Sequence, residues 1–599
     1  MCSRQSKRLR MALRPAVCAP TRNAGPARVR MRRRLAVAFI AITAVVVLAL
    51  AVCSRSNSSG IGGSSSTVRS IGYLVRDTAP QRVCASELGR KFAAILAPSA
   101  ASWGLLVHAS QAGGEIYRHD AETSFVPASN MKLLIAAVAL SRLTSSYRFE
   151  TRTYPASAAA SAAASAVCLL PAADPSFDDS ALDSLVARTL GALDLPRGAS
   201  VEVRVAGVGG AEAAPSTWES SDLAEAYGAQ PAPLVLNGNT VVVRVSPMGV
   251  GSTLRAQVVS PRDSGLVLVD VRESVTIAAA QRGAPPVNAG VSLGYALNER
   301  GALVLNVRGS LPAGSPPQDF DVAVRPTVRH FAAHLKDSLA KRGSSLGLRT
   351  SIRMLRRDDA SGSGGCGGAR MRGAPPLAAA ASAPLKDLLN HTLQVSDNLY
   401  AESILLAMGL ATPARGGARG GARGGLDKSA VLAATTTLDA LLRTESALAI
   451  GPRAPAVSPA AAPNGNGVAA TSGVLAGLRI ADGSGLSRHN LVTPRLLVAL
   501  LEAMRTTELR SIMPVAGRTG TLKYRMRNTA AEGRVFAKTG TMTGVSTLAG
   551  YMQHPTLGMT TFSFMANNAA GDVSQLKATE DALLVALAEA TREQVRSTC

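Results

Sequence analysis

The pattern of apolar and polar residues predicts a mixture of strands and helices along this chain of 599 residues. Alternating or β-branched runs are typical of strands. They occur at 103–107, 115–118, 201–205, 240–245, 266–271, 302–307, 348–354, 535–539, 548–552 and 560–565. Apolar residues at helical spacing occur at 133–140, 331–341, 385–408, 494–504 and 576–594. The order of these runs predicts an α/β (α+β) fold, in which an antiparallel sheet is flanked by helices.

Changes of composition predict where the domains begin and end. We expect a basic targeting leader over 1–34, a signal anchor or signal segment over 35–53, and a Ser/Gly linker over 54–74. The main domain is expected in two parts, 75–160 and 376–599, with smaller β-rich domains inserted at 161–375. Low-complexity insertions are expected at 411–425 and 454–467.

The leader suggests that the body of the protein lies beyond a membrane. Residues 1–34 carry +11 of the net charge of +24, and 35–53 is uncharged and long enough to span a bilayer. It can be an uncleaved anchor or a long signal sequence, and Cys53 ends a lipoprotein-like box in which Val52 is a departure. The compartment is then periplasmic, or the leader is an organelle transit peptide and the protein lies in a plastid envelope or lumen.

The remaining composition narrows the classes of partner and cofactor. The body is basic, but aromatic residues make up 4% of the chain and form no stripe with the basic ones, so no nucleic-acid partner is expected. Cys84, Cys168, Cys366 and Cys599 lie outside the targeting region, and their spacing leaves any pairing open. Neither the cysteines nor the seven histidines form a metal-ligand motif, so no metal and no cofactor are expected.

Candidate chemistry begins at Ser129, which follows a Pro-Ala pair and precedes the apolar run 133–140. Lys132 lies three residues later, and residues three apart share one face of a helix, so the Ser129 hydroxyl and the Lys132 amine can meet. The helix N-terminus adds partial positive charge and free N–H groups. The pattern alone has little weight, because Ser338 and Lys341 repeat it inside the helix expected at 331–341.

Two further motifs downstream distinguish the pair Ser129 and Lys132 from the pair Ser338 and Lys341. Ser396-Asp397-Asn398 interrupts the helical run 385–408, and Lys538-Thr539-Gly540 lies on a strand. Ser-x-x-Lys, Ser-Asp-Asn and Lys-Thr-Gly, in this order, resemble the signature set of serine penicillin-binding proteins and related β-lactamases. Each motif is weak alone, and Arg518-Thr519-Gly520 nearly duplicates the third.

The residue types suit an acyl transfer. Ser129 would be the nucleophile and Lys132 its general base, which must be neutral to accept the proton. Burial and a neighbouring cation, Lys538, favour the neutral form of Lys132. Ser396 would relay a proton to the leaving nitrogen.

The other residues of these motifs would bind the substrate. Asn398 offers an amide to the substrate backbone, and the strand of the third motif can pair with an extended peptide. Lys538 and Thr539 supply a charge and a hydroxyl for a terminal carboxylate, and Gly540 leaves room for close approach. The backbone N–H groups of Ser129 and Thr541 would form the oxyanion hole.

Ser396 follows Ser129 by 267 positions, which leaves room for a whole domain between the two motifs and narrows the choice of family. The chain resembles the D-alanyl-D-alanine carboxypeptidase/endopeptidase family, the class C low-molecular-mass penicillin-binding proteins. The resembling segments are 125–132, 174–177, 396–402, 482–488, 537–541 and 548–551. The likeness covers about 85–595, without the low-complexity runs.

This resemblance implies a split transpeptidase-type domain with inserted β-rich domains. It also implies hydrolysis of D-Ala-D-Ala ends or D-Ala cross-links of peptidoglycan stem peptides, and covalent inhibition by β-lactams. Attachment to a membrane is expected from the uncharged segment 35–53 itself. Two alternatives stay open, a serine β-lactamase and a non-catalytic peptidoglycan-binding relative. The inserted domain favours a peptidase over a β-lactamase, and the intact Ser129, Lys132, Ser396, Asn398 and Lys538 argue against a non-catalytic relative.

Overall fold

The computed structural model describes residues 86–156, 164–206, 215–259, 267–279, 290–298, 303–355, 366, 375–410, 428–443 and 475–596. The leader, the expected membrane segment, the linker and both low-complexity insertions lie outside the described residues. Within the described part of the chain, every helix is too short or too polar to cross a bilayer.

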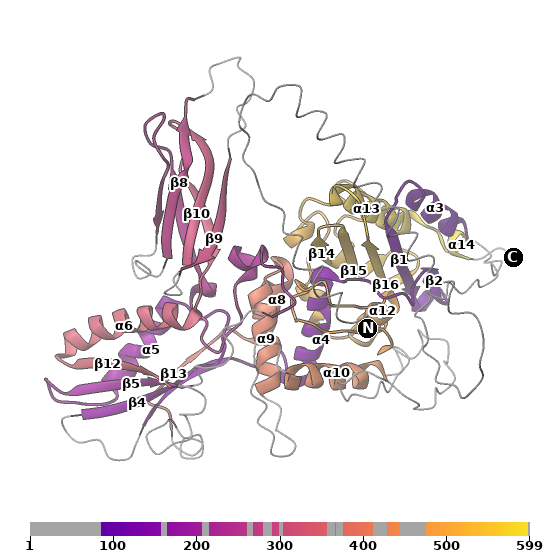
Figure 1. Ribbon diagram of the computed structural model, residues 1–599. Helices are drawn as coiled ribbons and strands as arrows, with labels where there is room; N and C mark the ends of the chain where they lie inside the picture. Colours follow the sequence, from indigo (N-terminus) through magenta and orange to yellow (C-terminus); the bar gives the residue numbers. More distant parts are fainter. Residues whose placement is uncertain are drawn as a thin grey trace, which may run out of the picture. The chain divides into compact units, whose positions relative to one another are not determined.

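One five-stranded sheet joins segments from the two ends of the described chain (Figure 1). Its strands, in spatial order, are β14 (Val535–Met542), β15 (Val545–His554), β16 (Gly558–Asn567), β1 (Ser102–Ala109) and β2 (Gly114–His119). Every neighbouring pair is antiparallel. The strand with the third motif, β14, is therefore an edge strand of this sheet.

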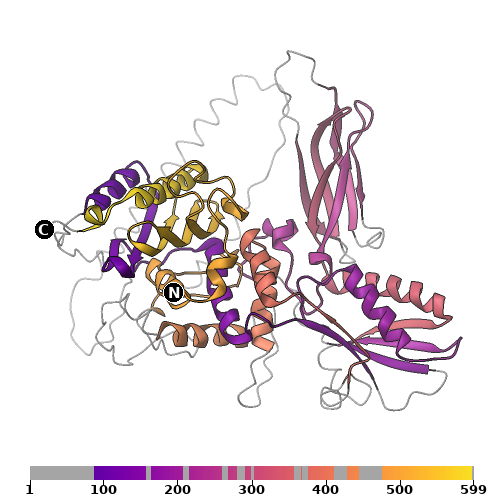
Figure 2. The same ribbon diagram turned by 180° about the vertical axis from the view of Figure 1, so that it is seen from behind.

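Helices cover both faces of this sheet, as Figures 1 and 2 show. One apolar core joins a face of the sheet to α4 (Met131–Leu143), α8 (Leu385–Gln394), α9 (Asn398–Leu410), α10 (Lys428–Leu442) and α12 (Pro494–Ala503). A second core packs α3 (Glu87–Leu96) and α13 (Val573–Glu589) on the other face. The expected fold class, an antiparallel sheet flanked by helices, is confirmed.

The region between the two parts of this domain is rich in strands. A five-stranded sheet has the order β12 (Arg349–Met354), β5 (Ser200–Val205), β4 (Ala164–Leu170), β3 (Glu150–Pro155) and β13 (Ala378–Ala381). It packs against α5 (Asp179–Gly191) and α6 (Thr327–Leu346). Two three-stranded sheets follow, β8 (Val267–Ile277), β10 (Leu303–Pro312), β9 (Val291–Leu297), and β11 (Gln318–Ala323), β6 (Thr240–Ser246), β7 (Arg255–Val258).

The five-stranded sheet takes in two strands outside the expected limits 161–375. β3 and β13 pair antiparallel, so the chain enters and leaves the region through neighbouring strands. In this region Cys168 and Cys366 form a disulfide, one of the pairings that spacing alone left open. It joins β4 to a residue 198 positions away.

The predicted elements agree with the structure except near the C-terminus. The single helix expected at 576–594 is wrong, because α13 ends at Glu589 and a separate turn, α14 (Arg592–Val595), follows. Ala590 is extended there, with a ψ of 141°, and the Thr591 side chain caps the new turn.

The described residues also form short 3₁₀ turns. These are η1 (Ser110–Ala112), η2 (Ala128–Asn130), η3 (Asp222–Ala224), η4 (Ala226–Gly228), η5 (Asn237–Asn239), η9 (Glu508–Ile512) and η10 (Gly520–Leu522).

Candidate active site

Ser129 lies in the 3₁₀ turn η2, directly before α4. Side chains from the central sheet hold the segment that leads into this turn. The Thr547 hydroxyl of β15 donates to Pro127 O at 2.8 Å, and Asn567 Oδ1 of β16 accepts from Val126 N at 2.8 Å. The start of the turn is thereby attached to two neighbouring strands, so Ser129 keeps a fixed place relative to β14.

Two glycines allow the backbone of this turn to be approached closely. A Cβ at Gly540 would lie 2.8 Å from Pro127 O and 3.0 Å from Ser129 N. A Cβ at Gly485, whose φ is +85°, would lie 1.8 Å from Ala128 O. Both positions therefore need glycine, and the third motif reaches the backbone of Ser129 because Gly540 has no side chain.

Lys132 is completely buried on α4. Its Nζ donates to Ser129 Oγ at 2.9 Å, to Asn398 Oδ1 at 2.6 Å and to Ser484 O at 2.7 Å. The contact with Ser129 is the one that the spacing of the first motif predicts, and the contact with Asn398 joins the first motif to the second. The lysine amine has a fixed orientation, with the serine hydroxyl within hydrogen-bond distance.

The surroundings of Lys132 favour its neutral form. Burial lowers the pKa of Lys132 to about 8, although Asp482, Glu402 and Asp397 attract its positive charge and act in the opposite direction. Desolvation penalises the ammonium form because a buried charge loses its hydration. A substantial fraction of Lys132 is therefore neutral near pH 8 and can accept a proton.

Lys538 of β14 is the second buried lysine of the site. Its Nζ donates to Ser396 Oγ at 2.8 Å and to Thr539 O at 2.7 Å, so the third motif contacts the second. Burial, and secondly the charge of Lys132, lower the pKa of Lys538 well below its usual value. The two lysines share one desolvated site, and the charge of Lys132 makes Lys538 easier to deprotonate.

The second motif lies at the break between α8 and α9. Ser396 has a φ of +65°, a left-handed conformation that costs energy in a residue other than glycine. Asp397 fixes this break, because its Oδ1 accepts from Tyr400 N at 3.1 Å and its Oδ2 lies 3.1 Å from His391 Nε2. The strained turn points the Ser396 hydroxyl at Lys538.

Asn398 uses both ends of its amide within the protein. Its Oδ1 accepts from Lys132, and its Nδ2 donates to Tyr227 O at 2.9 Å. The inserted region thus contributes a backbone carbonyl, that of Tyr227, beside the site. Contact of Asn398 with a substrate backbone stays a prediction.

The free edge of β14 offers backbone N–H groups. Ala537 N donates outward to Pro514 O at 3.0 Å, away from β15. Groups two residues apart on a strand point to the same side, so the N–H groups of Thr539 and Thr541 also point to the outer edge. With Ser129 N close to Gly540, the two expected oxyanion donors lie at the same end of β14.

The second Ser-x-x-Lys pair forms no such site. Ser338 is buried on α6, while the Lys341 side chain is 64% exposed and pairs with Asp337 at 2.7 Å. That amine is solvated and has a carboxylate partner. The structure thus separates the two pairs by the burial of the lysine.

Two residues of the site, Glu402 and Asp482, received no role from the sequence. Glu402 Oε1 accepts from Gly483 N at 2.9 Å and Ser484 N at 2.7 Å, which fixes the loop whose carbonyl contacts Lys132. Burial raises the pKa of Glu402 to about 8. Asp482 accepts from Trp218 Nε1 at 2.9 Å. Glu402 follows Asn398 by one helical turn, which is a usable signal, whereas nothing near Trp218 in the sequence points to Asp482.

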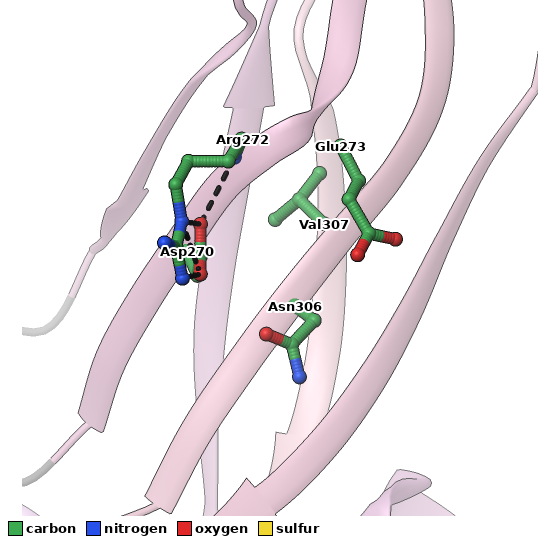
Figure 3. Close-up of a pocket in the computed structure, with 5 residues that line it drawn as sticks. All are labelled: Asp270, Arg272, Glu273, Asn306 and Val307. Carbon is green, nitrogen blue, oxygen red and sulfur yellow. Dashed lines mark hydrogen bonds and ion pairs between the residues drawn. The ribbon is translucent and has the colours of Figure 1, made fainter.

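Away from Ser129, a polar hollow lies on the inserted sheet, between β8 and β10 (Figure 3). It has a volume of about 310 Å³ and is lined by Asp270, Arg272, Glu273, Asn306 and Val307. Arg272 Nε donates to Asp270 Oδ1 at 3.0 Å, and the Arg272 side chain is 87% exposed. Its charges are paired and solvated, in contrast to those around Ser129.

The chain is similar to known proteins over most of its length. The family model described as the D-Ala-D-Ala carboxypeptidase 3 (S13) family matches 90–429 and 448–590. A D-alanyl-D-alanine carboxypeptidase of Actinomadura sp. (strain R39) is 32% identical over 517 residues, which cover 81% of each chain. A penicillin-sensitive carboxypeptidase A of Dictyostelium discoideum is 26% identical over 56% of this chain and 54% of that one.

The fold also has a solved counterpart. The crystal structure of penicillin-binding protein 4 from Haemophilus influenzae superposes with a TM-score of 0.62, at 20% identity, over 83% of this chain and 99% of that one. At this identity the likeness concerns the fold. The expected family is confirmed by the family model and by the identity to the Actinomadura enzyme: the chain belongs to the D-Ala-D-Ala carboxypeptidase 3 (S13) family.

Proposed function

We propose that this protein is a serine-type D-Ala-D-Ala carboxypeptidase/endopeptidase that acts through an acyl-enzyme on Ser129. One observation carries the assignment of the nucleophile. The fully buried Lys132 amine lies 2.9 Å from Ser129 Oγ, and its pKa is lowered to about 8. A lysine in this state can serve as the general base that a serine nucleophile needs.

Acylation would follow from these contacts. The proton of the Ser129 hydroxyl moves to the neutral Lys132 amine while Oγ bonds to the carbonyl carbon of the penultimate D-Ala. The N–H groups of Ser129 and Thr541 stabilise the negative charge on the carbonyl oxygen. The C–N bond then breaks, and Ser396 passes its proton to the leaving nitrogen and regains one from the lysine pair, which took up the proton of Ser129. Ser396 is suited to this role because Lys538 donates to its hydroxyl oxygen.

Substrate binding would use the free edge of β14. An extended stem peptide adds to the sheet as another strand, with Asn398 beside its backbone. Lys538 and Thr539 attract the terminal carboxylate, and Gly540 permits the close approach. Water then attacks the acyl-enzyme, which restores the Ser129 hydroxyl and releases a shortened peptide.

The ligand classes and the compartment belong to the same proposal. Stem peptides ending in D-Ala-D-Ala are the substrates, and β-lactams acylate Ser129. The first class agrees with the name of the Actinomadura relative, and a crystal structure of the Haemophilus protein complexed with a β-lactam agrees with the second. Such substrates place the protein outside the cytoplasm, in a periplasm or in the space around a plastid, with 35–53 as the membrane segment.

A fluorescent penicillin tests the assignment. The wild-type protein should be labelled covalently and release the label slowly, and Ser129→Ala should take up none, because the atom that forms the acyl bond is gone. Free D-Ala should appear when a D-Ala-D-Ala-ended peptide is added. A wild-type protein that takes up no label contradicts the proposal, and rapid release of label would favour the β-lactamase alternative.

A further inference from the structure

The outer edge of β14 is only partly free. Upstream of the third motif it is covered by the segment that begins at Pro514. Pro514 O accepts from Ala537 N at 3.0 Å, Ala516 N donates to Val535 O at 3.0 Å, and Val515 forms a bridge with Phe536. An added peptide strand can therefore pair with β14 from Thr539 onward but not before it.

The covering segment leaves the strand in a tight turn beside Thr539. Thr519 N donates to Val515 O at 3.0 Å, and the Thr519 hydroxyl oxygen accepts from Val515 N at 3.0 Å. Gly520 has a φ of +56°, and a Cβ there would lie 2.5 Å from Gln394 Oε1. The turn thus packs against the residue that lies two positions before Ser396, and the buried Leu522 anchors its far side.

This turn places a second hydroxyl next to the third motif. The Thr539 hydroxyl donates to Thr521 Oγ1 at 2.9 Å, and Thr521 is exposed. Thr521 was no candidate from the sequence, because it belongs to none of the three motifs. Hydroxyl hydrogens rotate freely about the C–O bond, so both groups can donate to an anion at this place.

Charge around the turn also favours an anion. Arg518 and Lys523 flank Thr519 to Leu522 in the sequence and are exposed, although the Arg518 guanidinium lies against Gly533 and Lys523 Nζ lies over the Tyr524 ring. The buried Lys538 lies next to Thr539. Positive groups around hydroxyl donors are the usual surroundings of a bound carboxylate.

We propose that Thr521 is a substrate-binding residue, which forms with Thr539 a pair of hydroxyls that holds the terminal carboxylate of the acyl donor. The proposal rests on the proposed peptidase function. If Thr541 N holds the scissile carbonyl oxygen, the residue after that carbonyl extends along the edge toward Thr539. The Pro514 segment blocks the edge beyond, so the main chain of the leaving residue must end at the two hydroxyls.

Two acyl donors that give the same acyl-enzyme test this role. One is an N-acyl-D-Ala-D-Ala peptide, and the other is an ester of the same N-acyl-D-alanine with a neutral thiol, whose leaving group has no carboxylate. Thr521→Val should lower kcat/KM for the peptide about ten-fold, mainly through KM, since a hydrogen bond to a charged group is lost. For the thiol ester kcat/KM should stay within about two-fold, and Thr521→Ser should restore the peptide reaction.

Thr579→Val on α13 is the matched control, because the Thr579 hydroxyl donates to Gln575 O of its own helix. It should leave both reactions unchanged. Equal losses with both donors for Thr521→Val would show a structural role and overturn the proposal, as would an unchanged peptide reaction or a Thr521→Ser variant no better than Thr521→Val. A wild-type protein that hydrolyses neither donor would overturn both this proposal and the peptidase function.

Discussion

Charged side chains gather both around Ser129 and on the inserted sheet. The lysines of the first group are buried, whereas the second group lies at the solvated surface. Lys132 and Lys538 are completely buried, and burial lowers the pKa of each. In the hollow between β8 and β10, Asp270 is held at a pKa of about 2, chiefly by its hydrogen bond to Arg272. There each charge has an opposite partner and water around it.

The difference shows what makes a charged cluster chemically useful. A solvated ion pair keeps both groups in their ordinary protonation states at neutral pH, so neither exchanges a proton easily with a substrate. Burial lowers the pKa of both lysines of the Ser129 site, and that of Lys132 to about 8, so its amine can exchange a proton near neutral pH. Substitutions in one of the two groups at a time test this difference, and the largest effect is expected at Lys132.

Lys132→Met should nearly abolish acylation by penicillin. Methionine has a similar length but cannot accept the Ser129 proton, so the second-order acylation rate should fall by about 10²–10⁴-fold, the usual contribution of a general base. The rate is measured from the time course of fluorescent labelling. Lys341→Met is the matched control, since Lys341 follows a serine at the same spacing but is 64% exposed. Its labelling rate should equal that of the wild type, and equal losses in both variants would contradict the role of Lys132.

The acylation rate should rise with pH and reach half of its plateau near pH 8. Only the neutral amine of Lys132 accepts a proton, and burial lowers the pKa of that amine to about 8. Below this pKa the amine is protonated and inactive, so the limb is on the acid side. Lys538, Asp482, Glu402 and Asp397 share the buried site and act on the same titration. A labelling rate that stayed constant between roughly pH 6 and 9 would contradict a lysine base.

The sequence predicted which residues meet at the candidate site better than it predicted the residues that hold them in place. Ser129 and Lys132 are three residues apart on one helical turn, and short motifs locate Ser396 and Lys538, because each function needs a fixed residue type at a fixed local spacing. Thr547 and Asn567 could not be found in this way. They are polar residues on the buried strands β15 and β16, and their contacts with the segment before Ser129 exist only after the sheet has formed.

The elements of the fold were predictable where a short-range pattern determines them, and the prediction failed where that pattern is weak. Alternation located β14, β15 and β16, and apolar spacing located α12. After Glu589 a single extended residue, Ala590, ends the helix, and the polar residues that follow are ones that a helix also accepts. No proline or glycine marks that position. Sheet order, including the pairing of β3 with β13, depends on contacts between distant segments that periodicity does not contain.

Glu402→Gln should shift the acid limb to lower pH by up to about half a unit. The Glu402 carboxylate attracts the Lys132 ammonium and raises its pKa. Glutamine keeps an acceptor oxygen for Gly483 N and Ser484 N, so the loop geometry should be retained. The Glu402 carboxyl has a pKa of about 8 and titrates in the same range as Lys132, which limits the shift. The measurement is the full pH profile of labelling, and a shift to higher pH would contradict the assigned sign.

Arg272→Ala, in the solvated hollow on the inserted sheet, should have the smallest effect on stability and labelling. The Arg272 side chain is 87% exposed and pairs with Asp270 in the same strand, so its removal breaks a solvated ion pair of low stability. We expect the Tm to change by less than about 2 °C and the labelling rate and its pH profile to be those of the wild type. Thermal unfolding and penicillin labelling measure the two quantities. A large loss of labelling would mean that the hollow on the inserted sheet acts on the Ser129 site, and the contrast between solvated pairs and buried lysines would then no longer separate the catalytic region from the rest.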